Sequence, residues 1–333
     1  MTPKVSIIMP VKNVAEYIED CIHSIRSQSF TDWELIIVND HSTDATQSLL
    51  DSFALADKRI QVHSNQGIGI IPALQLAFSL AKGAFITRFD GDDIMPDNRL
   101  ALIVKALASS TEKTIVTGKV KYFSDQPISK GYEAYEAWLN ERIDQKDHWQ
   151  WAYRECVIAS PNWIMRRNEL SAIGGFNDLT YPEDYDLVLR WNQHGFTVQG
   201  LDQITLYWRE HPARTSRNSD HYNQEHFFRL KVQHFVRHEL GDSALVLWGT
   251  DTKAKLTASI LTKLGTDFTW MGLVEEDNSK EIFNHPVSSY KAIENFQRPK
   301  LLIAVYPPEN QRVLLENYLR SLDLLMGKHY WYL

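Results

Sequence analysis

The sequence has few cysteines and no uninterrupted apolar run long enough to cross a membrane. Its two cysteines, Cys21 and Cys156, lie far apart without Cys-x-x-Cys spacing, so we expect neither a zinc site nor a disulfide framework. A reducing cytoplasm fits this pattern. The longest apolar tract, residues 67–81, is interrupted by Pro72 and Gln75 and is shorter than the roughly 20 residues that span a bilayer. Peripheral attachment at the inner face of a membrane stays open.

The sequence also lacks an excess of positive charge. Its 35 basic and 42 acidic residues give a formal net charge of -7, so no broad cationic surface is available and we expect no nucleic-acid partner. Residues 1–4 lead directly into an apolar run and leave no room for a signal peptide, so we expect no secretion. The 333 residues, 44% hydrophobic and 23% charged, are typical of a globular protein of about two domains.

Apolar runs alternate with segments of helical period through the first ninety residues. The predicted strands are 5–9, 33–38, 60–63 and 84–89, and the predicted helices are 14–27 and 72–81. Strands that alternate with helices indicate an α/β fold with a mainly parallel sheet covered on both faces. Ligands of such sheets bind where the carboxyl ends of the strands meet.

An acidic cluster, Asp90-Gly91-Asp92-Asp93, follows the fourth predicted strand. Carboxylates this close repel one another unless a cation or strong donors hold them, and Mg²⁺ or Mn²⁺ carrying phosphate oxygens would do so. Taken alone, the cluster is explained better by a solvated acidic turn, because Asp and Gly are the commonest turn residues. However, Asn39-Asp40 ends the second strand at the same edge of the sheet. Two such clusters at one edge favour a binding site.

Two later segments allow two interpretations each. Aromatic residues accumulate in residues 122–163, where they either shape a pocket or fill the core. Glu183 and Asp184 precede a helical stretch at 185–191, where the helix dipole favours acids whatever their function.

A second α/β pattern begins after Gly241. Its predicted elements are strands at 244–248, 268–274 and 301–306 and helices at 252–264 and 309–324. The chain is therefore predicted to contain a domain at 1–220, a connector helix at 221–240 and a smaller domain at 241–333, which is within the usual size range for a domain.

Four segments in order resemble a family 2 glycosyltransferase of the GT-A fold: Val5–Asn13, Trp33–Asp44, the Asn65/Gly67 turn and Asp90–Asp93. The resemblance continues through Pro161–Trp163, Gly174–Phe176, Glu183-Asp184 and Arg209–Ser216, about the first two thirds of the chain. It implies a metal-dependent, inverting transfer of a sugar from a nucleotide-diphosphate donor. The acceptor would be a hydroxyl of a glycan or lipid-linked intermediate in cell-surface polysaccharide synthesis. A UDP-sugar is favoured by family frequency.

The resemblance implies a role for several residues in binding the donor. Asp40 would accept a hydrogen bond from the nucleotide base, and Pro10, Val11 and Asn13 would line the nucleoside pocket. Asn39 stands where most relatives have an acid, and it can still form hydrogen bonds.

Further donor-binding candidates lie in the other matching segments. Asn65 belongs to the turn after the third strand, and Gly91 to the acidic cluster. Arg88 would pair with the neighbouring acids or reach a phosphate. Arg214, with His211 and Ser216, resembles the flexible segment that closes over the diphosphate.

The metal and the catalytic base are also assigned through the resemblance. Asp90 and Asp92 would form the DxD pair that touches the ribose and holds Mn²⁺ or Mg²⁺. Asp93 would be a supporting neighbour, although it is also explained by its place in a solvated turn. His211 is either a further metal ligand or a surface loop histidine. Asp184 matches the general base of the family, and Glu183 is the alternative.

Residues 187–191 end in Arg-Trp, as does the Q-x-x-R-W motif of processive synthases, but Leu187 stands at the first position. No transmembrane helices accompany the motif. Both departures favour the addition of one sugar at a time.

The C-terminal domain resembles a small Rossmann-like unit appended to some bacterial members of the family. Gly249 is the only glycine of a G-x-G-x-x-G fingerprint, although Glu275, Glu276 and Asp277 lie about where a ribose-binding acid would stand. A structural, acceptor-orienting or dimerising role, with a homodimer as one outcome, is therefore favoured over dinucleotide binding. Two other functions remain open: a noncatalytic nucleotide-sugar binding or scaffolding protein, and an NAD-dependent oxidoreductase.

Overall fold

The computed structural model describes residues 2–177, 179–272, 281–282 and 285–333. The chain forms two compact units, of which the first comprises Met1–His148 with Val157–Asn218 and the second comprises Trp149–Cys156 with Ser219–Leu333. Helix α9 (Gln224–His238), in the segment predicted as a connector, belongs to the second unit.

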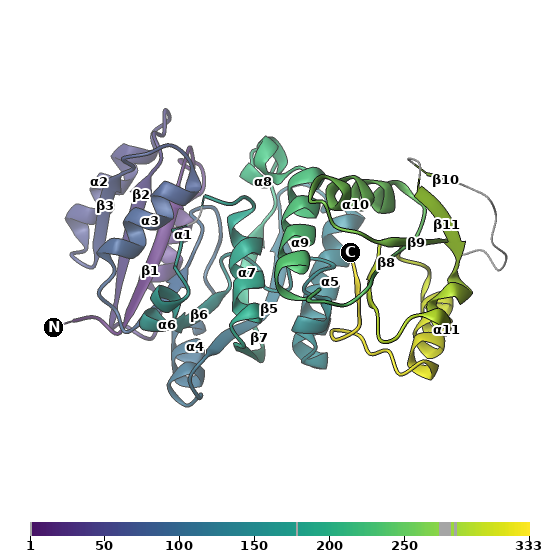
Figure 1. Ribbon diagram of the computed structural model, residues 1–333. Coiled ribbons are helices and arrows are strands. Elements are labelled where there is room, and N and C mark those ends of the chain that lie inside the picture. Colours follow the sequence, from purple (N-terminus) through teal and green to yellow (C-terminus); the bar gives the residue numbers. More distant parts are fainter. Residues whose placement is uncertain (1, 178, 273–280, 283–284) are drawn as a thin grey trace. The chain divides into compact units, whose positions relative to one another are not determined.

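A seven-stranded sheet forms the centre of the first unit (Figure 1). Its strands are β1 (Val5–Val11), β2 (Trp33–Asn39), β3 (Ile60–Ser64), β4 (Phe85–Arg88), β5 (Thr114–Phe123), β6 (Trp163–Arg166) and β7 (Thr197–Arg209). They are arranged in the order β3-β2-β1-β4-β6-β5-β7, and only β6 runs antiparallel to its neighbours among these strands. The predicted α/β fold with a mainly parallel sheet is confirmed.

Helices flank this sheet. They are α1 (Ile18–Arg26), α2 (Thr46–Ala56), α3 (Ile70–Leu80), α4 (Arg99–Ala108), α5 (Lys130–Gln145), α6 (Arg167–Ala172), α7 (Glu183–Gln193) and α8 (Thr215–Asn218). Helix α1 shows why they form: its buried residues Ile18, Cys21, Ile22 and Ile25 recur at helical spacing and face the core. Strands β1 and β2 are buried almost throughout, as expected for central strands covered on both faces.

The aromatic region at 122–163 is more regular than its sequence indicated, because much of it forms α5. Tyr122 stacks on Trp208 with ring centroids 4.9 Å apart, and Tyr135 stacks on Trp138 at 6.0 Å. All four rings belong to the hydrophobic core or pack against it. For these residues the core-filling interpretation is confirmed.

The second unit contains a six-stranded sheet of order β10-β11-β9-β8-β12-β13. Its elements are β8 (Leu245–Trp248), β9 (Thr269–Gly272), β10 (Glu281–Ile282), β11 (His285–Ser289), β12 (Lys300–Ile303), β13 (Tyr330–Tyr332), α9, α10 (Thr252–Lys263) and α11 (Glu309–Ser321). The described residues also contain the 3-10 helices η1 (His148–Trp151), η2 (Asp220–Tyr222) and η3 (Tyr290–Asn295). The second α/β domain is thus present, whereas its Rossmann-like character stays a prediction. Glu275, Glu276 and Asp277 lie outside the described residues.

No helix in the described ranges combines the length and the apolar character needed to cross a membrane.

Candidate active site

The predicted polar clusters follow strands that run parallel at the centre of the first sheet. Strand β1 pairs with β2 on one side and with β4 on the other. The backbone N–H of Asp40 donates to the carbonyl of Val11 at 2.8 Å, so the segments after β1 and β2 are in direct contact. The carboxyl ends of these strands therefore meet at one edge, as the sequence predicted.

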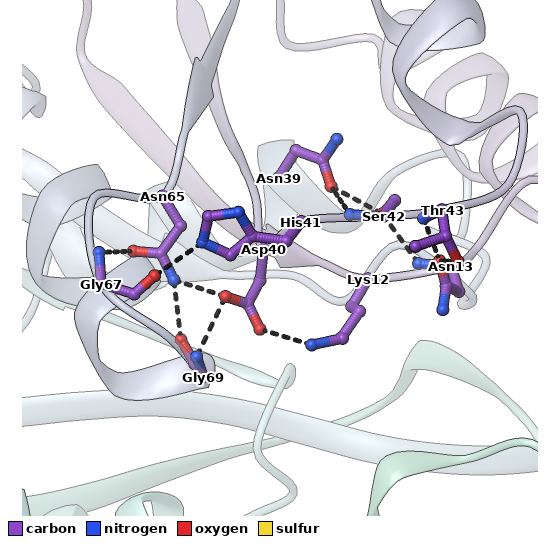
Figure 2. A network of polar contacts seen from close by, with 10 residues as sticks. All are labelled: Lys12, Asn13, Asn39, Asp40, His41, Ser42, Thr43, Asn65, Gly67 and Gly69. Carbon is purple, nitrogen blue, oxygen red and sulfur yellow. Dashed lines mark hydrogen bonds and ion pairs between the residues drawn. The ribbon is translucent and has the colours of Figure 1, made fainter.

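The buried carboxylate of Asp40 lies at the centre of the first polar group (Figure 2). Its Oδ1 accepts hydrogen bonds from Asn65 Nδ2 at 2.7 Å and from the backbone N–H of Gly69 at 3.0 Å, and its Oδ2 lies 3.2 Å from Lys12 Nζ. Burial alone would raise the pKa of Asp40, but the donors of Gly69, Asn65 and Lys12 outweigh it and lower the pKa below its usual value. Asp40 is therefore a fixed, ionised acceptor.

Two asparagines hold the loops around Asp40 together. Asn39 Oδ1 accepts hydrogen bonds from the backbone N–H of Ser42 at 3.0 Å and from Ser42 Oγ at 2.6 Å, and its Nδ2 donates to Gln47 at 2.7 Å. Asn13 Oδ1 accepts from the backbone N–H of Thr43, and the N–H of Asn13 donates to Ser42 Oγ, both at 2.8 Å (Figure 2). The described contacts of both side chains thus lie within these loops and the first turn of α2, and their role in donor binding stays a prediction.

Pro10, Val11 and Gly91 contribute close backbone packing. Pro10 and Val11 are the last residues of β1, and Val11 is buried. A Cβ atom added to Gly91 would lie 2.8 Å from Val11 Cγ1 and 3.1 Å from Ile18 Cδ1. Gly91 therefore lets the acidic turn approach the end of β1, and any larger residue would displace Val11.

Arg88, at the end of β4, links the acidic turn to helix α7. Its Nε lies 2.8 Å from Asp90 Oδ1 and its Nη2 donates to Asp90 Oδ2 at 3.3 Å, while Nη1 donates to Glu183 Oε1 at 3.0 Å. Arg88 and Glu183 are both buried. Of the two predicted roles of Arg88, the structure shows the pairing with acids.

Asp92 contacts His211, which follows β7. Asp92 Oδ2 lies 2.9 Å from His211 Nε2, and the imidazole packs on the ring of Tyr17 with centroids 4.4 Å apart. His211 lies in a loop, but its side chain is only 10% exposed, and its role as a metal ligand stays a prediction. Its Nδ1 is buried and has no hydrogen-bond partner among the described residues.

A carboxylate beside an imidazole is a donor set that suits Mn²⁺. In the part of the chain that the structure describes, no three His, Cys, Asp or Glu side chains converge as a metal site. Divalent ions in such sites commonly complete their coordination with substrate phosphates and water, so the pair fits a metal that arrives with a diphosphate.

Asp93 has a different surrounding from Asp90 and Asp92. It is 1% exposed, and its Oδ1 accepts a hydrogen bond from the backbone N–H of Arg209 at 2.9 Å. A solvated turn is therefore the wrong account of this residue. Burial, with a further contribution from Asp92 and Asp90, raises its pKa well above the usual value.

Arg214 forms an ion pair with Glu210, which lies four residues earlier in the sequence. Its Nη1 donates to Glu210 Oε2 at 2.9 Å, and Arg217 Nη2 forms an ion pair of 2.6 Å with Glu210 Oε1. The guanidinium of Arg214 lies 5.0 Å from the ring centre of Trp208. In this arrangement the segment after β7 is held by two ion pairs and an aromatic surface. A contact of Arg214 with a diphosphate stays a prediction.

Asp184 and Glu183 occupy the first turn of α7 but differ in their surroundings. Glu183 is bound to Arg88, whereas Asp184 Oδ1 accepts a hydrogen bond from the backbone N–H of Tyr185 at 2.8 Å. Burial, strengthened by Glu183 and Asp90 and opposed by Arg88, raises the pKa of Asp184 to about 7. A carboxylate with a pKa near neutrality is suited to accept a proton.

Four residues of this region were not identified from the sequence: Lys12, Tyr17, Gly69 and Arg209. Lys12 lies within the first matching segment and pairs with Asp40. Arg209 donates through Nε to the carbonyl of Asp92 at 2.9 Å, and its guanidinium lies 5.0 Å from the ring centre of Tyr17. Tyr17 and Gly69 have no local signal, because their contacts come from other parts of the chain.

The chain belongs to glycosyl transferase family 2, whose family model matches residues 6–174, just over half of the chain. It is 27% identical over 280 residues to an uncharacterized glycosyltransferase of Haemophilus influenzae, covering 79% of this chain and 85% of the relative. It is 38% identical over 209 residues to the putative teichuronic acid biosynthesis glycosyltransferase TuaG of Bacillus subtilis, covering 62% and 79%. These findings show that the protein is a glycosyltransferase.

A longer relative is the chondroitin synthase of Pasteurella multocida, which is 36% identical over 229 residues, 68% of this chain and 22% of the synthase. Two solved structures have the same fold. S. aureus TarS 1–349 in complex with UDP-GlcNAc gives a TM-score of 0.52 at 18% identity, covering 78% of this chain and 71% of TarS. The mannosyltransferase PcManGT of Pyrobaculum calidifontis, in complex with GDP-Man and Mn²⁺, gives 0.53 at 21% identity, covering 71% and 64%.

Proposed function

We propose that this glycosyltransferase transfers one sugar, with inversion and with the help of a divalent metal, from a nucleotide-diphosphate donor to a hydroxyl of a glycan or lipid-linked acceptor. The observation that carries this proposal is the bridge of ion pairs from the partly buried Asp90 through the buried Arg88 to the buried Glu183. It joins the acidic turn that would bind the donor to the helix that carries Asp184. The names of relatives, teichuronic acid biosynthesis and chondroitin synthesis, support a role in polysaccharide synthesis.

The donor would lie at the edge formed by the ends of β1, β2 and β4. Asp40, fixed by Asn65, Gly69 and Lys12, would accept a hydrogen bond from the nucleotide base. A carboxylate has about four lone-pair sites, so the three existing contacts leave room for one more donor. Solved relatives carry UDP-GlcNAc or GDP-Man, and we propose a UDP-sugar for this chain.

The metal would be held by Asp90, Asp92 and His211 together with phosphate oxygens. When bound, Mn²⁺ or Mg²⁺ supplies positive charge that stabilises the departing diphosphate. Asp92 and His211 already lie 2.9 Å apart, so the two side chains need to separate only slightly to admit an ion. Arg214, paired with Glu210, would add positive charge on the same side of the site.

Asp184 would act as the general base. Its role is to take the proton from the acceptor hydroxyl as the oxygen attacks the anomeric carbon, and a direct attack opposite the leaving diphosphate inverts that carbon. Glu183 is the weaker candidate because its carboxylate pairs with Arg88. Membership of a transferase family argues against a noncatalytic scaffold. For the second unit we propose a structural, acceptor-orienting or dimerising role, and for the whole protein a cytoplasmic location, where its two free cysteines stay reduced.

The proposal is tested by a thermal-shift panel of UDP- and GDP-sugars with and without Mn²⁺. A nucleotide sugar that binds the native state raises the melting temperature. We expect at least one UDP-sugar to do so, with a larger shift in the presence of Mn²⁺, and the same sugar to be transferred in an activity assay. A complete absence of Mn²⁺-dependent shifts across the panel would contradict the proposed function.

A further inference from the structure

A small pocket lies beside Asp184 in the interior of the first unit. Its volume of about 10 Å³ is roughly the space of a single water molecule. Four polar residues line it, namely Arg88, Ser160, Asp184 and Trp191. The remaining walls are apolar: Ile158, Trp163, Phe176, Leu187 and Val188.

Two of the polar residues have unsatisfied atoms. Ser160 Oγ and Trp191 Nε1 are buried, and neither has a hydrogen-bond partner within the described part of the chain. Trp191 is 1% exposed and comes from α7, and Ser160 comes from the segment before β6. A buried donor without a partner is costly, so two of them around one pocket indicate that something polar fills it.

We propose that this pocket holds one internal water molecule, bound by Ser160 and Trp191, that donates a hydrogen bond to the Asp184 carboxylate. Ser160 and Trp191 are then positioning residues for the base. Only this positioning role rests on the proposed function, because the water site itself requires no catalysis.

The donors and acceptors of the pocket match the needs of a water molecule, which usually makes about three hydrogen bonds when buried. The indole N–H of Trp191 can only donate, and the hydroxyl of Ser160 can donate or accept. The water can then donate to the carboxylate of Asp184. Besides this water, the charged groups that face Asp184 are Glu183, Arg88 and Asp90.

The water affects the base in a definite direction. A hydrogen bond donated to a carboxylate favours its ionised form and lowers its pKa. Burial pushes the pKa of Asp184 upward, so the water opposes this effect and keeps part of the base ionised at neutral pH. It also fixes the direction of one carboxylate oxygen.

The site is tested first by a crystal structure of the full chain at a resolution that shows ordered water. We expect density for one water molecule within hydrogen-bond distance of Ser160 Oγ and Trp191 Nε1. In Trp191→Phe, which keeps an aromatic ring beside Trp163, the water should be lost or displaced. An empty pocket in the native protein, or wall atoms that bond directly to one another, would overturn the inference whatever the activity.

The positioning role is tested by the pH dependence of kcat. Loss of one hydrogen bond should raise the apparent pKa of the base by about one unit in Trp191→Phe and Ser160→Ala. At a pH equal to the apparent pKa of the native base, this shift lowers kcat about fivefold, and two pH units higher it lowers kcat hardly at all. Equal losses at both pH values would show a merely structural effect and overturn the positioning role.

Trp33→Phe is the matched control. Trp33 Nε1 is also buried and without a partner among the described residues, but Trp33 is the first residue of β2, at the strand end opposite to Asp40. Its pH profile should equal that of the native enzyme. A native protein without any transferase activity would contradict the proposed function and leave the crystallographic test of the water unaffected.

Discussion

Arg88 and Glu183 are 95 residues apart in the sequence, and their side chains form a buried ion pair of 3.0 Å. Arg88 also pairs with Asp90, so one guanidinium neutralises two carboxylates from different elements. This arrangement fixes the start of α7, and with it Asp184, against the end of β4. In the proposed mechanism, Arg88 would thereby set the distance between the bound donor and Asp184.

Removal of Arg88 should destabilise the first unit strongly. Arg88→Met leaves the buried Glu183 and the partly buried Asp90 without their cation, and we expect the free energy of unfolding to fall by about 3 kcal/mol. The double variant with Glu183→Gln should recover part of this loss. Urea denaturation measures both effects, with Arg229→Met of the exposed Arg229–Glu225 pair as a control of little effect. A double variant no more stable than Arg88→Met would contradict the bridge.

Asp92→Ala should abolish the Mn²⁺-dependent part of nucleotide binding and leave the fold intact. His211→Ala should keep binding but require about tenfold or more Mn²⁺, since a metal loses one supporting group. Titration of UDP at fixed Mn²⁺, and of Mn²⁺ at fixed UDP, separates the two effects. Asp97→Ala, an exposed acid on the following loop, is the control. Native UDP affinity of Asp92→Ala in Mn²⁺ would exclude Asp92 from the metal site.

The activity should rise with pH through about 7, because Asp184 accepts a proton only when ionised and its pKa is raised to about 7. Asp184→Asn should bind the donor normally and reduce kcat by about 10²-fold or more, with loss of this pH dependence. Initial rates at saturating donor provide the measurement. Near-native turnover of Asp184→Asn would move the base to another residue.

The same raised pKa predicts a cost in stability. Because the folded pKa of Asp184 lies above its unfolded value, the protonated acid stabilises the fold below about pH 4, and this contribution is lost as the pH rises through about 7. Asp184→Asn should therefore be more stable than the native protein at pH 8, by up to about 4 kcal/mol, and similar at pH 4. Urea denaturation of both proteins at pH 4 and pH 8 measures this difference. Equal stabilities of Asp184→Asn and the native protein at pH 8 would argue against a raised pKa of Asp184.

Gly91→Ala should destabilise the turn because the new methyl group meets Val11 Cγ1 at 2.8 Å. We expect a loss of about 1–3 kcal/mol, as for other overpacked sites. The added substitution Val11→Ala removes the clash and should restore part of the stability lost in Gly91→Ala. If Gly91→Ala is as stable as the native protein, the close approach is not a constraint.

Local patterns predicted the alternating strands and helices and the position of Asp40 and Asp92 at strand ends, because these depend on period and on turn chemistry. They did not predict Glu183 as a second partner of Arg88 or the contact of His211 with Tyr17, since these join segments far apart in the chain. The sequence did not predict helix α5, because its aromatic residues are weak helix formers and their packing, rather than helix propensity, determines the local structure. For the same reason Trp149–Cys156 was not assigned to the second unit.

The asparagine and serine contacts between the loops after β1 and β2 restrict which amino-acid substitutions these loops can accept. Asn13 and His41 both hold left-handed backbone conformations, with φ of 52° and 55°, and Asn13 binds Ser42 and Thr43 of the second loop. A substitution in one loop removes a partner from the other. Variants with altered nucleotide preference should therefore arise through paired substitutions, one in each loop, and single substitutions should mostly be deleterious.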